Sequence, residues 1–339
     1  MASHESQLPP HVRLIQMGMG AWVSRIVFTA AELGIADLLA DGPKSAEELA
    51  GSTKGHARTL HRLLRSLANF GILRHEEGGR FALTPLGEAL KSGAPGSARS
   101  TILAMTGSWM WKALEEFPYS VETGKTSMEK VFGMPIFDYL AQHVDQAAQF
   151  SEAMVGVHGG EPPAVAAAYD FSDAGVIVDV GGATGHMLAH ILSRYRQPKG
   201  WLFDRPHVVT AAPELLRAHG VEERVVIKQG NFFESVPAGG DLYILSHIIH
   251  DWSEEQCLTI LGNCRKAMKP ASKLLIVEFV LPDDGTPHFG KLADMIMLAI
   301  PGGEERTGEE YRALLAKAGL RATRVVPTAS DVSIVEAVA

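Results

Sequence analysis

The sequence predicts an α/β protein in which a helical, winged-helix-like N-terminal part precedes a Rossmann-like domain. Residues 10–160 carry apolar side chains at helical spacing and little strand-like alternation. From about residue 170, short apolar runs alternate with helical segments, which is typical of a doubly wound sheet. A glycine-rich turn joins the first of these runs to a helix, as in nucleotide-binding α/β domains. At 339 residues, the chain is long enough for two domains.

The bulk composition argues against several classes of protein. The formal net charge of −8 disfavours a nucleic-acid partner, which usually needs a basic surface. We expect no membrane span, because the apolar runs look too short, and no signal peptide in "MASHESQLPPHVR". Cys257 and Cys264 lie on one predicted helix and are interpreted as core thiols in a reducing compartment. We therefore expect a cytoplasmic protein.

The first hundred residues predict a winged helix. Ser45 and Glu48 form a capping box at the start of a helix, and the alternation around Gly78-Gly79 indicates a two-stranded hairpin. Between them, a stripe of leucines marks the buried face of a second helix, at Leu60, Leu63, Leu64 and Leu67. Residues 45–90 contain six Lys or Arg and five Asp or Glu, too balanced for a DNA reader. The module is therefore better interpreted as a packing domain than as a DNA-binding regulator.

A second helical segment carries aromatic and methionine side chains that suit either an interface or the wall of a substrate pocket. The sequence leaves both interpretations open. The Gly-Gly-Glu-Pro-Pro stretch at 159–163 suggests a boundary. We expect three regions: a winged-helix-like domain at 1–100, a helical region at 101–165 that forms a linker or substrate wall, and the Rossmann-like domain at 166–339.

The Rossmann-like domain is predicted from its apolar runs. Continuous apolar strands are expected where a parallel sheet is covered on both faces. Seven segments are predicted to be strands: 176–180, 200–204, 224–229, 241–249, 272–281, 321–327 and 331–338.

The turn after the first strand has the pattern Asp179-x-Gly-Gly-x-x-Gly, with glycines at 181, 182 and 185. The next strand ends in Asp204, which is suited to accept hydrogen bonds from a ribose. A dinucleotide fingerprint would read G-x-G-x-x-G, and a pyrophosphate gains nothing from an acid at position 179. A cationic sulfonium and ammonium do gain from it. The turn therefore favours S-adenosylmethionine (SAM) over NAD, although glycine-rich turns are also common without a ligand.

The stretch "LSHIIHDWSEEQ", residues 245–256, ends the fourth predicted strand, and Ser253 with Gln256 forms a capping box for the next helix. His250 is thus expected at the rim of the crevice, where an imidazole can accept a proton at neutral pH. For a lone histidine there, the better interpretation would be that it only caps a helix or fills a gap. Glu278 at the end of the fifth strand, together with Glu304 and Glu305 in a later loop, supplies carboxylates that could orient the ring.

A metal site is not expected. His247 and Asp251 lie close in sequence to His250, but the ligand spacing that zinc requires is missing.

These segments together resemble the SAM-dependent small-molecule O-methyltransferases, which include plant caffeic-acid-type enzymes and bacterial enzymes acting on polyketides and phenazines. The resemblance rests on "VDVGGATGH", "FDRPHVV", "GNFFE", "HIIHDWSEEQC", "IVEFVLP" and "PGGEERT", in this order after the helical region. It covers nearly the whole chain. It implies a homodimer formed through the N-terminal domain, and neither nucleic acid nor membrane as a partner.

The resemblance also implies roles for individual residues. His250 matches the family's general base, and Glu278 and Glu305 match its flanking acids. A cofactor set follows the edge of the sheet: Asp179, Gly181, Gly182, Gly185, Asp204, Arg205, Asn231, Phe232 and Ser246. Asn231 stands where the family usually has Asp, and Ser246 where plant members have Lys.

The expected reaction transfers a methyl group from SAM to a hydroxyl, leaving S-adenosylhomocysteine. A phenol is the best acceptor, because its pKa of about 10 is within reach of a histidine base. Candidate substrate-binding residues are Trp109, Phe117, Phe137, Met154, Asp251, Met295 and Met297. For all of these except Asp251, core packing is an equally good interpretation. The alternatives are a SAM-binding relative with cyclase- or hydroxylase-like chemistry, and a ligand-responsive DNA-binding regulator.

Overall fold

The computed structural model describes residues 8–94 and 96–339. The chain forms two compact units. The first combines Met1–Lys112 with Leu140–Gly159, and the second combines Ala113–Tyr139 with Gly160–Ala339. Residues of the 101–165 segment therefore fall in both units, and each unit is described by itself.

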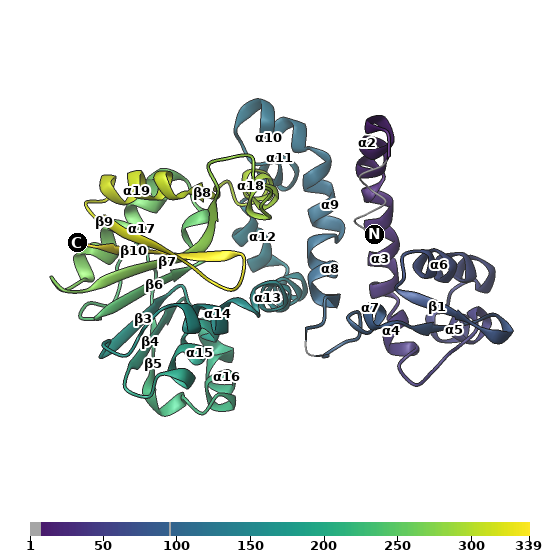
Figure 1. The fold of residues 1–339 in the computed structure, drawn as a ribbon, viewed down its shortest axis with the longest axis horizontal. Coiled ribbons are helices and arrows are strands. Elements are labelled where there is room, and N and C mark those ends of the chain that lie inside the picture. The colour runs from purple at the N-terminus through teal and green to yellow at the C-terminus, as the bar shows by residue number, and fades with distance from the viewer. Residues whose placement is uncertain (1–7, 95) are drawn as a thin grey trace. The chain divides into compact units, whose positions relative to one another are not determined.

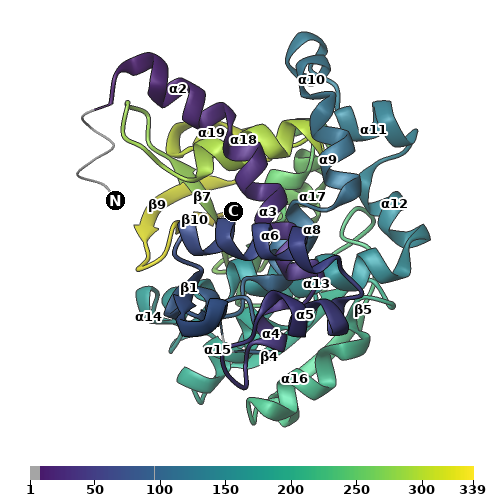
Figure 2. The ribbon, with the colours of Figure 1, turned by 90° about the vertical axis from the view of Figure 1, so that its right-hand side faces the viewer.

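The first unit is almost entirely helical, as its sequence pattern predicts. Its elements are α2 (Pro10–Gly18), α3 (Gly20–Glu32), α4 (Ile35–Leu38), α5 (Ala46–Thr53), α6 (Ala57–Asn69), β1 (Leu73–Glu76), β2 (Arg80–Leu83), α7 (Pro85–Glu88), α8 (Arg99–Met105), the start of α9 (Ser108–Glu115) and α13 (Val144–His158). Helices α8 and α13 lie side by side although some 40 residues separate them (Figure 2).

Helix α5, helix α6 and the β1–β2 hairpin follow one another in the predicted order. The capping box of Ser45 and Glu48 is present, and the hairpin pairs Leu73 with Leu83. Leu60, Leu64 and Leu67 of α6 are buried in one apolar cluster with the hairpin, whereas Leu63 packs at its margin. The helical leucine spacing was therefore a reliable guide to this core.

Helices α2 and α3 expose large apolar side chains. Leu14 is 69% and Trp22 66% exposed, with Ile15, Met17 and Met19 also exposed. The run Pro10–Glu32 is 23 residues long and apolar enough to cross a membrane by length and composition, so the expectation that every apolar run is too short was wrong. Arg13 and Arg25 interrupt this run without making it polar on average. A single run of this kind near the N-terminus is weak evidence for a membrane.

The second unit is built on an eight-stranded sheet in the order β5-β4-β3-β6-β7-β10-β9, with β8 paired to β7. Its strands are β3 (Val176–Val180), β4 (Lys199–Asp204), β5 (Val225–Gln229), β6 (Leu242–Ser246), β7 (Lys273–Leu281), β8 (Arg306–Thr307), β9 (Arg321–Pro327) and β10 (Val332–Val338). β3 to β7 are parallel, and β10 runs antiparallel to β7 and β9. The predicted strands are therefore present, and the two-residue β8 was missed.

Helices cover both faces of this sheet, as continuous apolar strands require (Figure 1). α14 (Glu161–Ala168), α15 (His186–Arg194) and α16 (Ala212–Ala218) pack on one face. α17 (Glu254–Ala267) and α19 (Gly308–Lys317) pack on the other, and a capping box starts each of them, the one of Ser253 and Gln256 at α17 as predicted. Cys257 and Cys264 are free and buried on α17. The remaining helices include α10 (Phe117–Thr123), α11 (Ser127–Phe132), α12 (Ile136–Gln142, which ends in the first unit) and α18 (Gly290–Ala299).

The fourth predicted strand ends earlier than expected. β6 stops at Ser246, His247 takes a left-handed backbone with φ of 52°, and Ile249–Asp251 forms a 3₁₀ turn. His250 therefore belongs to a turn and not to the end of a strand. Successive N–H groups of a strand point to opposite sides, whereas those of a turn converge. In this turn they converge on Glu278, which belongs to the candidate site.

Candidate active site

The glycine turn follows β3 at the carboxyl edge of the sheet, where open α/β sheets bind ligands. Gly181 and Gly185 have φ of 73° and 85°, in the region that glycine adopts without strain. At Gly182 a β-carbon would lie 2.4 Å from the carboxylate of Asp179, so no side chain fits there. The predicted glycines are thus required by the geometry of the turn, which brings the backbone close to whatever binds beside it.

Asp179 is fully buried, and neither of its carboxylate oxygens has a hydrogen-bond partner among the described residues. Burial, followed by the nearby charge of Asp204, raises the pKa of Asp179 to about 7. A buried carboxylate without a partner is costly, and a cation bound beside it would offset that cost. The residue therefore fits the cationic end of SAM.

The other members of the predicted cofactor set lie at the ends of the neighbouring strands. Asp204 ends β4 and accepts hydrogen bonds from the backbone of Ala183, at 2.9 Å, and of Arg205, at 2.7 Å. The pKa of Asp204 is raised, mainly because the carboxylate is buried. Asn231 follows β5 and accepts from Phe233 at 3.1 Å, while Phe232 lies edge-on to Trp252. These residues lie at the carboxyl ends of adjacent parallel strands, as does Ser246 at the end of β6.

His250 is buried, and its Nδ1 lies 2.8 Å from Oε1 of Glu305. Its Nε2 lies 3.7 Å from Oδ1 of Asp251. Burial alone would lower the pKa of His250, but Asp251, Glu305 and Glu278 outweigh it and raise the pKa to about 10. The Glu305 contact fixes the ring through one nitrogen and leaves the other to meet a proton, as in other imidazole–carboxylate pairs.

Glu278 holds the backbone of the same turn. Its Oε1 accepts from the N–H groups of Ile248, Ile249 and His250, at 3.0, 2.6 and 3.3 Å. Its Oε2 accepts from the hydroxyl of Tyr311. Burial raises the pKa of Glu278, and the positive charge of His250 acts in the opposite direction. Of the two predicted flanking acids, Glu305 therefore contacts the imidazole, whereas Glu278 orients the backbone that carries it.

The loop that supplies Glu305 passes extremely close to the histidine turn. At Gly303 a β-carbon would lie 1.8 Å from the carbonyl oxygen of His250, so only glycine fits. The backbone N–H of Glu305 donates to Asp294 at 2.9 Å, which fixes the residue at its own end. Arg306, also buried, donates to the carbonyl of Ile249 at 3.5 Å.

The glycine turn and the histidine turn touch each other. A β-carbon at Gly181 would lie 2.4 Å from Cδ1 of Ile248, two residues before His250. A ligand held at the glycine turn would thus lie next to the turn that carries the imidazole.

The predicted substrate-binding residues are spread over both units. In the second unit, Phe137 stacks on Trp252 with ring centroids 5.5 Å apart. Trp252 is the residue that follows Asp251. Met295 and Met297 lie on α18 and Phe117 begins α10. Trp109 and Met154 belong to the first unit, where Trp109 lies edge-on to Phe150.

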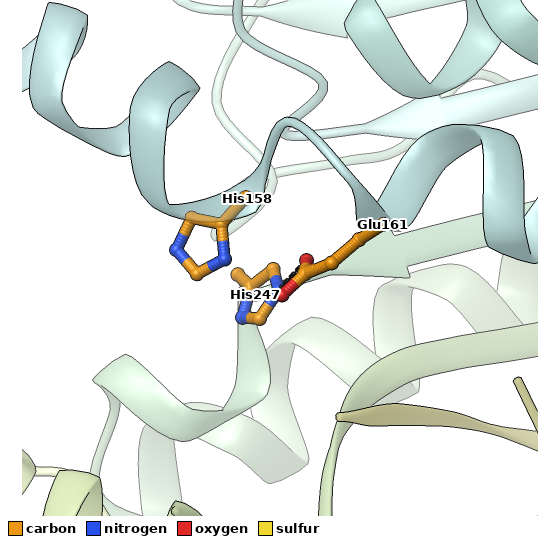
Figure 3. Close-up of side chains that lie close together, drawn as sticks. All are labelled: His158, Glu161 and His247. Carbon is orange, nitrogen blue, oxygen red and sulfur yellow. Dashed lines mark hydrogen bonds and ion pairs between the residues drawn. The ribbon is translucent and has the colours of Figure 1, made fainter. Parts of the chain in front are cut away.

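Several residues of the site were missed by sequence reasoning. Tyr311 and Asp294 bind the two acids, but each looked like an ordinary helix residue. Glu161, the first residue of α14, lies 2.6 Å from Nε2 of His247 (Figure 3). The Gly-Gly-Glu-Pro-Pro stretch was interpreted only as a boundary. An acid that opens a helix beside two glycines could have indicated that Glu161 belongs to the site.

Comparison with known proteins gives the family. The O-methyltransferase dimerisation domain matches residues 15–93 and the O-methyltransferase domain matches residues 111–321. The chain is 45% identical to a phenazine O-methyltransferase, PhzM, of Lysobacter antibioticus, covering 96% of this chain and 95% of that one. It is 37% identical to a mitomycin biosynthesis 6-O-methyltransferase of Streptomyces lavendulae, covering 94% and 91%. The crystal structure of LaPhzM superposes with a TM-score of 0.93 at 44% identity, covering 98% and 99% of the two chains.

Proposed function

This chain belongs to the SAM-dependent O-methyltransferases, and from that membership we propose that it methylates a phenolic hydroxyl of a small aromatic metabolite with His250 as the general base. The observation that carries the proposal is the His250–Glu305 pair, buried in a turn that touches the glycine turn. Family membership makes the chain an enzyme, so neither the DNA-binding regulator nor the non-methylating relative is needed to explain it.

The glycine turn and its acids would hold the cofactor. Asp179 supplies a buried negative charge for the ammonium or sulfonium, and Asp204 has lone pairs left for ribose hydroxyls. Asn231 and Phe232 would border the adenine. SAM supplies an electrophilic methyl group, and the chain's task is to hold the acceptor oxygen in line with it.

His250 then takes the acceptor's proton. Glu305 holds Nδ1 at 2.8 Å and stabilises the imidazolium that forms. Because the neighbouring carboxylates raise the pKa of His250, the proton affinity of the ring moves towards that of a phenolate, whose pKa is about 10. The raised pKa also means that the fraction of enzyme in the base form increases as the pH rises. A cation held at the glycine turn would oppose this shift and favour the neutral ring.

A planar aromatic acceptor fits the side chains near the histidine turn. The stacked pair of Phe137 and Trp252 offers flat apolar surface, and Met295 and Met297 offer polarisable thioethers. Asp251, beside Nε2 of His250, could accept a hydrogen bond from a second polar group of the substrate. The phenazine and mitomycin relatives act, by their names, on polycyclic metabolites, which supports the same class here.

The apolar stripe on α2 and α3 supports a homodimer. The dimerisation domain begins at residue 15, within this stripe of Leu14, Ile15, Met17 and Trp22. An exposed apolar surface of this kind is typical of a protein interface. The two free, buried cysteines suit a reducing compartment, and we place the enzyme in the cytoplasm.

The test measures methyl transfer from SAM that is labelled in its methyl group. The acceptors form three matched panels of naphthalene- or phenazine-based compounds, which carry a hydroxyl group, an amino group or a carboxyl group respectively. The proposal predicts a labelled methyl ether from hydroxyl acceptors. Transfer to amino acceptors alone would contradict it, as would cofactor binding without transfer to any panel.

A further inference from the structure

A second imidazole–carboxylate pair lies beside the first. Nε2 of His247 donates to Oε2 of Glu161 at 2.6 Å, and both side chains are largely buried (Figure 3). The ring of His247 lies 5.1 Å from that of His250 and 5.8 Å from that of Phe279, measured between centroids. The pair therefore sits against the base, yet none of its atoms is needed for the proton transfer described above.

The backbone at His247 explains why a pair is needed here. A φ of 52° places this residue in the left-handed region, which residues other than glycine rarely adopt. This conformation ends β6, because the N–H of His247 still bonds to Val277, whereas the next three N–H groups converge on Glu278. Strain of this kind persists only where surrounding contacts hold it. The bond to Glu161 is such a contact, and it ties the start of the histidine turn to the first residue of α14.

We infer that the Glu161–His247 pair is a positioning device for the base: it fixes the residue at which the chain leaves β6 and thereby aims the turn that carries His250. The turn is then held at three points, by Glu161 at its first side chain, by Glu278 at its backbone and by Glu305 at the imidazole. This inference rests on the proposed role of His250. A shift of about 1 Å at a reacting group can cost about 10²-fold in rate, so loss of one anchor should be measurable in kcat.

Two variants separate the side-chain bond from the backbone strain. Glu161→Gln keeps the size of the side chain and removes its charge. His247→Gly removes the bond to Glu161 but makes the left-handed backbone free of strain. If the pair aims the base, both variants lose about 10- to 100-fold in kcat, while SAM affinity by calorimetry stays near that of the wild type. A wild-type kcat in both variants would overturn the inference.

The effect must also depend on His250. In a His250→Gln background, adding Glu161→Gln should cause no further loss of turnover, because the pair acts only through the imidazole. Equal losses in both backgrounds would mean that Glu161 supports the fold in general, and the inference would be wrong. Glu336→Gln is the matched control, since this buried carboxylate of the same unit binds Tyr169, Lys273 and Arg324 and no residue of the histidine turn. It should leave kcat unchanged even where it lowers the melting temperature.

The experiment distinguishes this inference from the proposed function. If His250→Gln itself retains wild-type turnover, the proposed base is wrong. If His250→Gln loses turnover but Glu161→Gln and His247→Gly do not, only the positioning role fails.

Discussion

Replacing Gly303 with alanine tests whether the contact between two loops sets the rate. The new β-carbon would lie 1.8 Å from the carbonyl oxygen of His250 and 2.7 Å from the carbonyl carbon of Asp251. Both are backbone atoms, so no side chain can rotate out of the way. Since carbon and oxygen do not approach within 3.0 Å in such contacts, the loops must separate by about 1 Å.

The separation has a calculable consequence. Overpacking of this kind costs about 1–3 kcal/mol of stability. More specifically, it moves Glu305, two residues along, away from Nδ1 of His250, a bond that is now 2.8 Å long. A displacement of about 1 Å predicts a loss of about 10²-fold in kcat on a phenol that the enzyme accepts.

The assay compares kcat at saturating SAM, SAM affinity by calorimetry and the melting temperature. Gly308→Ala is the control in the same segment, because its β-carbon would meet only Val280 and Val325 at 3.8 Å. We expect the Gly308 variant to behave as the wild type and the Gly303 variant to bind SAM but turn over slowly. A folded Gly303→Ala enzyme with wild-type kcat would refute the reasoning. Should that variant fail to fold, Glu305→Gln, which leaves the backbone alone, must show the loss instead.

Three other outcomes are expected. Asp204→Ala should weaken SAM binding by about 1.5–3 kcal/mol, the size of a charge-assisted hydrogen bond, and unchanged affinity by calorimetry would show that Asp204 is not the ribose acid. Because the pKa of Asp179 is raised to about 7, SAM affinity should increase as the pH rises through this value and the carboxylate forms. Asp179→Asn should remove that dependence, and a wild-type affinity that is flat with pH would count against the assignment. Light scattering should give a dimer at micromolar concentration, and Trp22→Glu should shift it towards monomer, whereas a monomeric wild type would exclude the proposed interface.

The parallel strands could be predicted because their apolar residues are continuous, and the helix starts because capping boxes are local. Ser45 with Glu48, Ser253 with Gln256 and Thr307 with Glu310 each form within four residues of sequence. The glycine turn could be predicted for the same reason, since Gly181 and Gly185 have a positive φ and a β-carbon at Gly182 would meet Asp179, three residues earlier.

The parts that could not be predicted depend on distant contacts. β6 ends at Ser246 because Glu278 accepts hydrogen bonds from the N–H groups that follow, the first of them from Ile248, 30 positions earlier. Glu161 meets His247 across 86 positions, and no periodicity connects them. β8 has two residues, too few to show alternation. The sequence could therefore bring His250 and Glu305 to one edge of the sheet, but not say which acid holds the ring and which holds the backbone.

The proposed methyl transfer depends most directly on His250, and the pH–rate profile of His250→Gln tests this role. On an accepted phenol at pH 7, turnover should fall by about 10²–10⁴-fold while SAM affinity stays near that of the wild type. Activity should recover as the pH approaches about 10, where the phenol ionises without help. A variant that keeps wild-type turnover at pH 7 would contradict the account.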